Sequence, residues 1–192
     1  PLYYPRYVSG YERVKMTTMT QTNTTEMELL TDTIVIFGAT GDLCKRKLIP
    51  ALYRLWDKET LPENFRIIGA SRTPHTRESW IEHLGLAQYH EEFREILDYI
   101  PCNLSDVDSL RALPLEGNTT YFLSVPPERY SDAIQNLKEA GLVDDAERSR
   151  VVVEKPFGYD LQSADHLQSV VGRCLREKQV YRIDHYLGKD TV

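Results

Sequence analysis

Residues 38–43 combine small and hydroxyl-bearing side chains in a pattern that could hold a phosphate group. Gly38 permits a tight turn, and Gly41 lets the backbone approach a bulky ligand closely. Thr40 can donate a hydroxyl hydrogen bond to the same ligand, and a helix that starts after the turn presents free N–H groups to an anion. Positive charge follows one turn later, at Lys45, Arg46 and Lys47. The chemistry indicated is the binding of a pyrophosphate.

The spacing of this turn departs from two well-known phosphate-binding signatures. Thr40 stands where the fingerprint G-x-G-x-x-G has its second glycine, and Leu43 or Cys44 stands where a third might be sought. No G-K-S/T sequence follows, so the turn is not a P-loop. An ordinary strand-to-helix turn with Asp42 as its N-cap is the alternative that these residues leave open.

The residue after the second predicted strand bears on the choice between NAD and NADP. Enzymes that prefer NAD usually place an acidic residue there, which binds the ribose 2′-hydroxyl group. This chain has no acidic residue there, and Arg72 stands two residues after the strand. A guanidinium group suits a 2′-phosphate as a bidentate partner, so Arg72 favours NADP. A solvated surface charge is the alternative.

Residues 182–189 place two cations and a carboxylate after a predicted strand. If the segment turns helically, His185 and Lys189 share one face, and two adjacent cations suit a phosphate monoester. From residue types alone, His185 is also a candidate general base, because histidine titrates near neutral pH. Glu154 and Lys155 likewise follow a predicted strand, where open α/β sheets bind ligands, although a solvent-exposed ion pair is the alternative.

Alternating strands and helices must position these groups. We expect strands at residues 33–37, 66–70, 119–125, 150–153 and 180–183, and helices at residues 42–58, 78–84, 91–97, 127–140 and 161–178. The alternation predicts an α/β fold, a Rossmann-like doubly wound parallel sheet with helices on both faces. We expect residues 32–192 to form this domain and residues 1–31, polar and rich in threonine, to be a disordered extension.

Composition excludes several classes of function. The net charge of -6 argues against a nucleic-acid binder, and no apolar run is long enough to predict a membrane span. Three dispersed cysteines predict reduced thiols in a cytoplasmic protein, with no metal site. Because the chain starts at Pro1 and stops at Val192, soon after a dense motif, we expect a fragment cut before a second domain.

Three segments resemble the glucose-6-phosphate dehydrogenase family. Residues 37–48 are similar to its nucleotide-binding segment, usually G-A-S/T-G-D-L-A-x-K/R-K, although Cys44 stands where alanine is common. The strings V-E-K-P-F-G at residues 153–158 and R-I-D-H-Y-L-G-K at residues 182–189 agree in order and spacing, and the second is highly specific. The resemblance covers residues 33–192 and is weaker between Arg72 and Thr119.

The resemblance implies NADP as cofactor and assigns residues to it. In the family the glycine turn holds the pyrophosphate, an arginine the 2′-phosphate, and a tyrosine lies along the cofactor. The implied residues are Gly38, Ala39, Thr40, Gly41, Asp42, Leu43, Cys44, Lys45, Arg72, Tyr130 and Lys155. For Tyr130, a helix-face aromatic that packs on the sheet is the alternative.

The resemblance also implies the substrate and the reaction. The family transfers a hydride from C1 of glucose 6-phosphate to NADP+, giving 6-phosphoglucono-δ-lactone and NADPH, the entry step of the pentose phosphate pathway. Asp184 would orient a base histidine that lies further along the family's chain and is absent here. The implied substrate-binding residues are Lys155, His185, Tyr186 and Lys189.

Three further expectations complete this interpretation. The full-length enzyme is expected to be a homodimer or homotetramer. The alternatives are a hexose-6-phosphate dehydrogenase with broader tolerance and a catalytically inactive NADP-binding module. The remaining histidines fall in no matching motif and are expected on the surface: His75, His83, His90 and His166.

Overall fold

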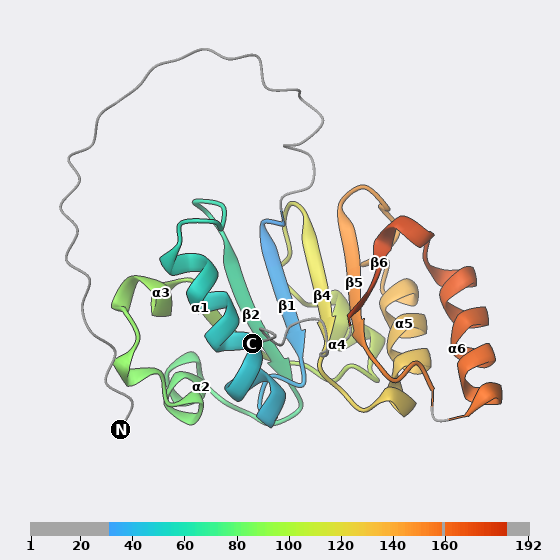
Figure 1. Cartoon of the computed structure of the whole chain (residues 1–192), viewed down its shortest axis with the longest axis horizontal. Helices are drawn as coiled ribbons and strands as arrows, with labels where there is room; N and C mark the ends of the chain where they lie inside the picture. The colour runs from blue at the N-terminus through green and yellow to red at the C-terminus, as the bar shows by residue number, and fades with distance from the viewer. Residues whose placement is uncertain (1–30, 159, 184–192) are drawn as a thin grey trace, which may run out of the picture.

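A six-stranded parallel sheet forms the centre of the molecule. The computed structural model describes residues 31–158 and 160–183; most of the predicted extension and Asp184, His185, Tyr186 and Lys189 lie outside them. The strands are β1 (Thr33–Phe37), β2 (Arg66–Ser71), β3 (Leu97–Pro101), β4 (Thr119–Leu123), β5 (Ser149–Glu154) and β6 (Val180–Ile183). They lie in the order β3-β2-β1-β4-β5-β6, every neighbouring pair parallel (Figure 1).

Helices cover the sheet on both faces, so the predicted doubly wound fold is confirmed. A π-helical turn (Cys44–Leu48) leads directly into α1 (Ile49–Asp57). The other helices are α2 (Arg77–Leu84), α3 (Glu91–Glu95), α4 (Val107–Arg111), α5 (Tyr130–Glu139) and α6 (Leu161–Cys174), with short 3-10 turns at Leu86–Gln88, Pro127–Arg129 and Glu177–Gln179. No helix in the described ranges is both long and apolar enough to cross a membrane.

Two hydrophobic clusters divide these helices between the faces. Ile49, Trp80 and Phe93, from α1, α2 and α3, pack with strand residues such as Ile36 on one face. Leu110, Ile134 and Val170, from α4, α5 and α6, pack with strand residues such as Val35 on the other. Since Val35 and Ile36 are adjacent in β1, the alternation of a strand assigns one side chain to each core.

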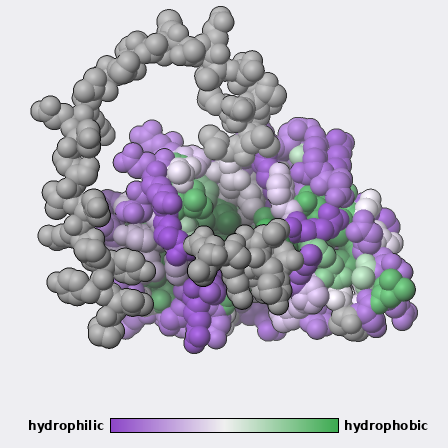
Figure 2. Space-filling view, viewed as in Figure 1, coloured by the Kyte–Doolittle hydropathy of each residue, from purple (hydrophilic) through white to green (hydrophobic). Residues whose placement is uncertain are grey.

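On the face that carries α1, the β5–β6 half of the sheet leaves apolar side chains exposed. The register pairs Val152 with Tyr181 and Glu154 with Ile183, so these four side chains point to the same face. Tyr181 and Ile183 are 43% and 39% exposed. Figure 2 shows the surface in the same view, and hydrophobic residues are visible there among mostly hydrophilic ones.

The edge strand β3 corrects the predicted helix at residues 91–97, which ends at Glu95. Phe93 and Leu97 share a helical spacing, but Leu97 and Tyr99 are both buried at the two-residue period of a strand. Pairing with β2, which sets Leu97 opposite Ile67 and Tyr99 opposite Gly69, overrides the local helical pattern.

Two further boundaries differ from the predictions. Helix α4 was not predicted; Asp106 caps it by accepting from the N–H of Asp108. Helix α6 ends at Cys174 rather than at Lys178, because Leu175 adopts an extended conformation (φ -130°, ψ 152°) that stops the helix.

Candidate functional site

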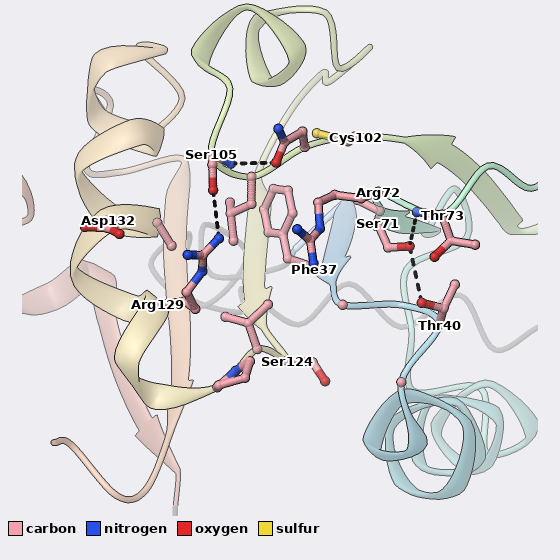
Figure 3. A pocket seen from close by; sticks show the side chains of 18 residues that line it. Phe37, Thr40, Ser71, Arg72, Thr73, Cys102, Ser105, Ser124, Arg129 and Asp132 are labelled. Atoms are coloured by element: carbon pink, nitrogen blue, oxygen red, sulfur yellow. Dashed lines mark hydrogen bonds between the residues drawn. The ribbon is translucent and has the colours of Figure 1, made fainter. Parts of the chain in front are cut away.

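A cavity of about 290 Å³ lies at the carboxyl ends of β1, β2, β3 and β4 (Figure 3). It lies beside β1, the strand at which the order of strands in the sheet reverses. The strands β2 and β3 are added on one side of β1, and β4 follows on its other side. Such switch points are the usual ligand sites of open α/β sheets. The lining comprises Phe37, Gly38, Thr40 and Gly41 at and after the end of β1, Ala70 to Thr73 at and after the end of β2, Cys102 to Ser105 after β3, Ser124 to Pro126 after β4, and Arg129, Asp132 and Ala133 at the start of α5.

The two glycines of the turn after β1 have different structural roles. Gly38 has φ +82°, and a Cβ there would stand 2.0 Å from the carbonyl oxygen of Ser124, so only glycine fits. Its N–H donates to Ala70 O at 2.9 Å, which ties the turn to β2. At Gly41 a Cβ would meet only Gly38 O, at 3.2 Å. Apart from this one tight contact, no other non-neighbouring atom lies within 4 Å of that Cβ position, which leaves room for a ligand to approach the backbone there.

The turn leaves several backbone donors available. Gly41 N–H donates back to Gly38 O at 2.9 Å and closes the turn. Among the described residues, the N–H groups of Thr40, Asp42 and Leu43 donate to no other group. Thr40 precedes the helical run that continues into α1, and Asp42 and Leu43 begin it, so the positive end of the helix dipole adds to their attraction for an anion.

A chain of hydroxyl groups links the glycine turn to β2 and β3. Thr40 Oγ1 lies 3.3 Å from Ser71 Oγ, which lies 2.8 Å from the Tyr99 hydroxyl. Tyr99 in turn donates to the carbonyl oxygen of Thr73. Burial raises the pKa of Tyr99, so its hydroxyl stays protonated as a donor at neutral pH. The sequence did not point to Ser71 or Tyr99; Tyr99 lies on β3, a strand that was not predicted.

Helix α2 braces the same turn from outside the pocket. The indole Nε1 of buried Trp80 donates to Ala39 O at 3.0 Å. His83 Nε2 lies 3.1 Å from Thr40 O, and Lys45 Nζ donates to the carbonyl oxygen of His83 at 2.6 Å. His83 is on the surface, as expected, yet its ring contacts the backbone of the candidate site.

Three predicted phosphate-binding residues direct their side chains elsewhere. Cys44 is fully buried in the α1 core, where burial raises the pKa of its thiol to about 12, so only its backbone can face a phosphate. Asp42 forms an exposed ion pair with Arg46 at 3.7 Å and, in the described structure, makes no capping hydrogen bond. Lys45 is engaged with His83, as above.

Two arginines face the cavity. Figure 3 shows the guanidinium groups of Arg72, after β2, and Arg129, before α5, directed into the pocket from opposite sides. Both residues are exposed, and neither forms an ion pair within the described part of the chain. Arg129 Nη2 donates to Ser105 Oγ at 3.1 Å. The sequence pointed to Arg72 but not to Arg129 or Ser105. The one feature that could have indicated Arg129 is its position as a cation soon after the predicted strand at residues 119–125.

Tyr130 and Lys155 lie outside this cavity. Tyr130 is only 2% exposed and belongs to the α5 core, where its hydroxyl accepts from the N–H of Glu154 at 3.3 Å. Tyr130 therefore packs in the core, which is the alternative to cofactor contact that the sequence left open. Lys155 is exposed after β5, its N–H donates to Ile183 O at 3.1 Å, and the Lys155–Pro156 peptide bond is cis.

Comparisons with known proteins agree on one family. The family model "Glucose-6-phosphate dehydrogenase, NAD binding domain" matches residues 35–192. A glucose-6-phosphate 1-dehydrogenase from Aggregatibacter actinomycetemcomitans is 41% identical over 180 residues, which cover 83% of this chain and 36% of that protein. The chain thus spans about a third of the length of such relatives.

Solved structures show the same likeness. A glucose-6-phosphate dehydrogenase in complex with its substrate glucose-6-phosphate has a TM-score of 0.71 and 31% identity, over 84% of this chain and 38% of that one. Glucose-6-phosphate 1-dehydrogenase from Mycobacterium avium has a TM-score of 0.72 and 32% identity, over 82% of this chain and 37% of that one.

Proposed function

Because this chain belongs to the glucose-6-phosphate dehydrogenase family of oxidoreductases, we propose that it forms the NADP-binding part of such an enzyme. The enzyme would transfer a hydride from C1 of glucose 6-phosphate to NADP+, giving 6-phosphoglucono-δ-lactone and NADPH. The family match supports the reaction, and the cavity at the switch point supports the cofactor. When bound, the nicotinamide ring supplies the hydride acceptor.

The glycine turn would hold the cofactor's pyrophosphate. Gly41 leaves room for close approach, and the free N–H groups of Thr40, Asp42 and Leu43 are suitable donors. Gly38 and Ala39 would set the shape of the turn through their bonds to β2 and α2. Cys44 would contribute backbone only, and Lys45 a nearby positive charge.

Arg72 carries the proposal that the cofactor is NADP rather than NAD. It stands at the end of β2, projects into the cavity, and has no ion-pair partner among the described residues. A 2′-phosphate would supply that partner through charge-assisted hydrogen bonds. Tyr130 would support this site from the core, by packing, rather than touch the cofactor.

The substrate side of the site rests on the motifs at residues 153–158 and 182–189. Lys155 would bind the sugar and lie near the nicotinamide, while His185, Tyr186 and Lys189 would bind the sugar and its phosphate. Asp184 would orient the histidine that removes the C1 hydroxyl proton, which holds that base in the productive tautomer. We also propose cytoplasmic location, the pentose phosphate pathway, and a homodimeric or homotetrameric enzyme, all on the family resemblance.

The reaction is tested by mixing the protein with NADP+ and glucose 6-phosphate and following NADPH absorbance. In the protein at the full length of its relatives, which would include the base histidine, we expect NADPH formation that depends on the 6-phosphate, with free glucose as the comparison. Broad turnover of other hexose 6-phosphates would favour the alternative hexose-6-phosphate dehydrogenase. NADP+ binding without any turnover, in the protein at the full length of its relatives, would favour a catalytically inactive module and contradict the proposal.

The cofactor assignment is tested by Arg72→Ala. Since a hydrogen bond to a charged group is worth about 1.5–3 kcal/mol, we expect NADP+ affinity to fall about 10- to 150-fold and NAD+ affinity, which involves no 2′-phosphate, to fall much less. Calorimetric titration with each cofactor measures both values. Arg173→Ala is the matched control, because Arg173 lies on α6, outside the cavity. An unchanged preference for NADP+ in Arg72→Ala would show that Arg72 does not bind the 2′-phosphate.

A further inference from the structure

Arg129 is a second cation of the cavity to which neither the motifs nor the proposed function gives a role. It enters from the start of α5, on the side of the pocket opposite Arg72 (Figure 3). The hydrogen bond from its Nη2 to Ser105 Oγ, 3.1 Å long, links the segment after β4 to the segment after β3 across the pocket. This bond orients the guanidinium group of a residue that is exposed.

The space between the two arginines suits a flat, aromatic group. Leu104 and Val125, both partly buried against the core, line it together with Phe37. The side-chain amide of Asn103 accepts from Ser105 N–H through Oδ1, and its Nδ2 has no partner among the described residues, so it can donate to a heteroaromatic nitrogen. An apolar slot with one donor at its edge recognises a purine better than it recognises a free anion.

The electrostatics of the slot point the same way. Two guanidinium groups directed into one cavity repel each other. The face of a π-system is negative and attracts a cation on each side. Arginine is the side chain best suited to this, because its planar and weakly hydrated guanidinium group can stack on a ring.

We propose that Arg129 stacks on the adenine ring of the cofactor, opposite Arg72, and is a binding residue for the adenosine half of the dinucleotide; this rests on the proposed function. Arg72 discriminates NADP from NAD through the 2′-phosphate. Arg129 binds a part that both cofactors share, so it adds affinity without discrimination.

Titrations of Arg129→Ala and Arg129→Lys with NADP+ and NAD+ test this assignment. We expect both variants to weaken both cofactors by a similar factor, about 3- to 30-fold, because lysine keeps the charge but loses the planar group. Ser105→Ala removes the tether of Arg129, and a smaller loss is expected, again equal for the two cofactors. Glu128→Ala is the matched control, since Glu128 is exposed, adjacent in sequence, and outside the cavity lining.

Each other outcome overturns the proposal in a distinct way. A loss confined to NADP+ would assign Arg129 to the 2′-phosphate, and full retention in Arg129→Lys would assign it a role by charge alone. Unchanged affinities in Arg129→Ala would remove it from the site while leaving the proposed function intact. If the wild-type protein bound neither dinucleotide, the proposed function itself would fail.

Discussion

The two glycines of the turn after β1 differ in whether the fold itself requires them to be glycine. Gly38 is required by the backbone, because its φ is +82° and a side chain there would collide with the Ser124 carbonyl group. Gly41 has no such constraint from the folded chain beyond a 3.2 Å contact with Gly38 O. Two similar residues, three positions apart, therefore have different reasons to be glycine.

We predict opposite outcomes for alanine at these positions. Gly38→Ala should lower the free energy of unfolding by at least about 1–3 kcal/mol, through strain and the clash with β4. Gly41→Ala should keep a melting temperature near that of the wild type but lose most NADP+ affinity, because its methyl group occupies the path of the pyrophosphate. Thermal melts and calorimetric titrations measure the two effects. A Gly41→Ala variant that binds NADP+ normally would contradict a backbone approach at this turn.

Cys44 shows how a motif match can misplace a side chain. The sequence put it beside the phosphates, where the family commonly has alanine, and the structure turns its thiol into the core of the α1 face. The reason is the helical path from Asp42 onward, which directs this position inward against the sheet. A small apolar residue is what the core needs there, and cysteine meets that need.

At the scale of elements, α2 is the support on which the turn depends. Trp80 and His83 lie on this helix and contact the carbonyl oxygens of Ala39 and Thr40. Gly69 allows the helix to come this close, because a Cβ at that position in β2 would lie 2.4 Å from the Trp80 ring. The position of α2 is therefore coupled to the shape of the site.

We predict that His83→Ala weakens NADP+ binding about 2- to 10-fold, the worth of one net hydrogen bond, with no change in the ratio of NADP+ to NAD+ affinity. His83 acts as a positioning residue, so His83→Gln, which retains a donor, should recover part of the loss. His166→Ala on α6 is the control, since it is exposed and outside the cavity. A change in cofactor preference would mean that His83 contacts the 2′-phosphate region directly.

The elements of the sheet were predictable from sequence where strands are buried on both sides. Residues 33–37 and 150–153 form continuous apolar runs or nearly so, and the structure places β1 and β5 there. Leu97–Pro101 mixes a carboxylate and a proline with apolar residues, because it pairs on one side only. This strand was not predicted, and therefore the segment after it, which contributes Asn103 and Ser105 to the cavity, was not predicted to line the site.

The structure brings together the parts of the predicted site that a local motif specifies. The glycine turn and Arg72 meet in one cavity, as their positions after adjacent parallel strands predict. Arg129 could not be assigned in the same way, because its role depends on Ser105, which is 24 residues away in sequence. Tyr130 was ambiguous because an aromatic residue at the start of a helix can face either the ligand or the core.

At the scale of the whole molecule, strand order creates the site. Helices α1 to α3 pack on one face and α4 to α6 on the other, and the chain reverses its direction of winding at β1. The segments after β1 and β4 lead to helices on opposite faces of the sheet, and both segments line the cavity. Two other cavities, of about 230 Å³ beside α5 and α6 and about 470 Å³ beside α2 and α3, lie away from this point.

Binding of NADP+ in the cavity beside β1 can be located residue by residue from backbone amide chemical shifts, followed by NMR during titration with NADP+. We expect the largest changes at Thr40, Gly41 and Asp42, with further changes after β2 and β3 at Arg72 and Asn103. Changes centred on Gln168 or Ile81, which line the two other cavities, would place the cofactor elsewhere. Either that result or no change at saturating NADP+ would show that the cavity beside β1 is not the cofactor site.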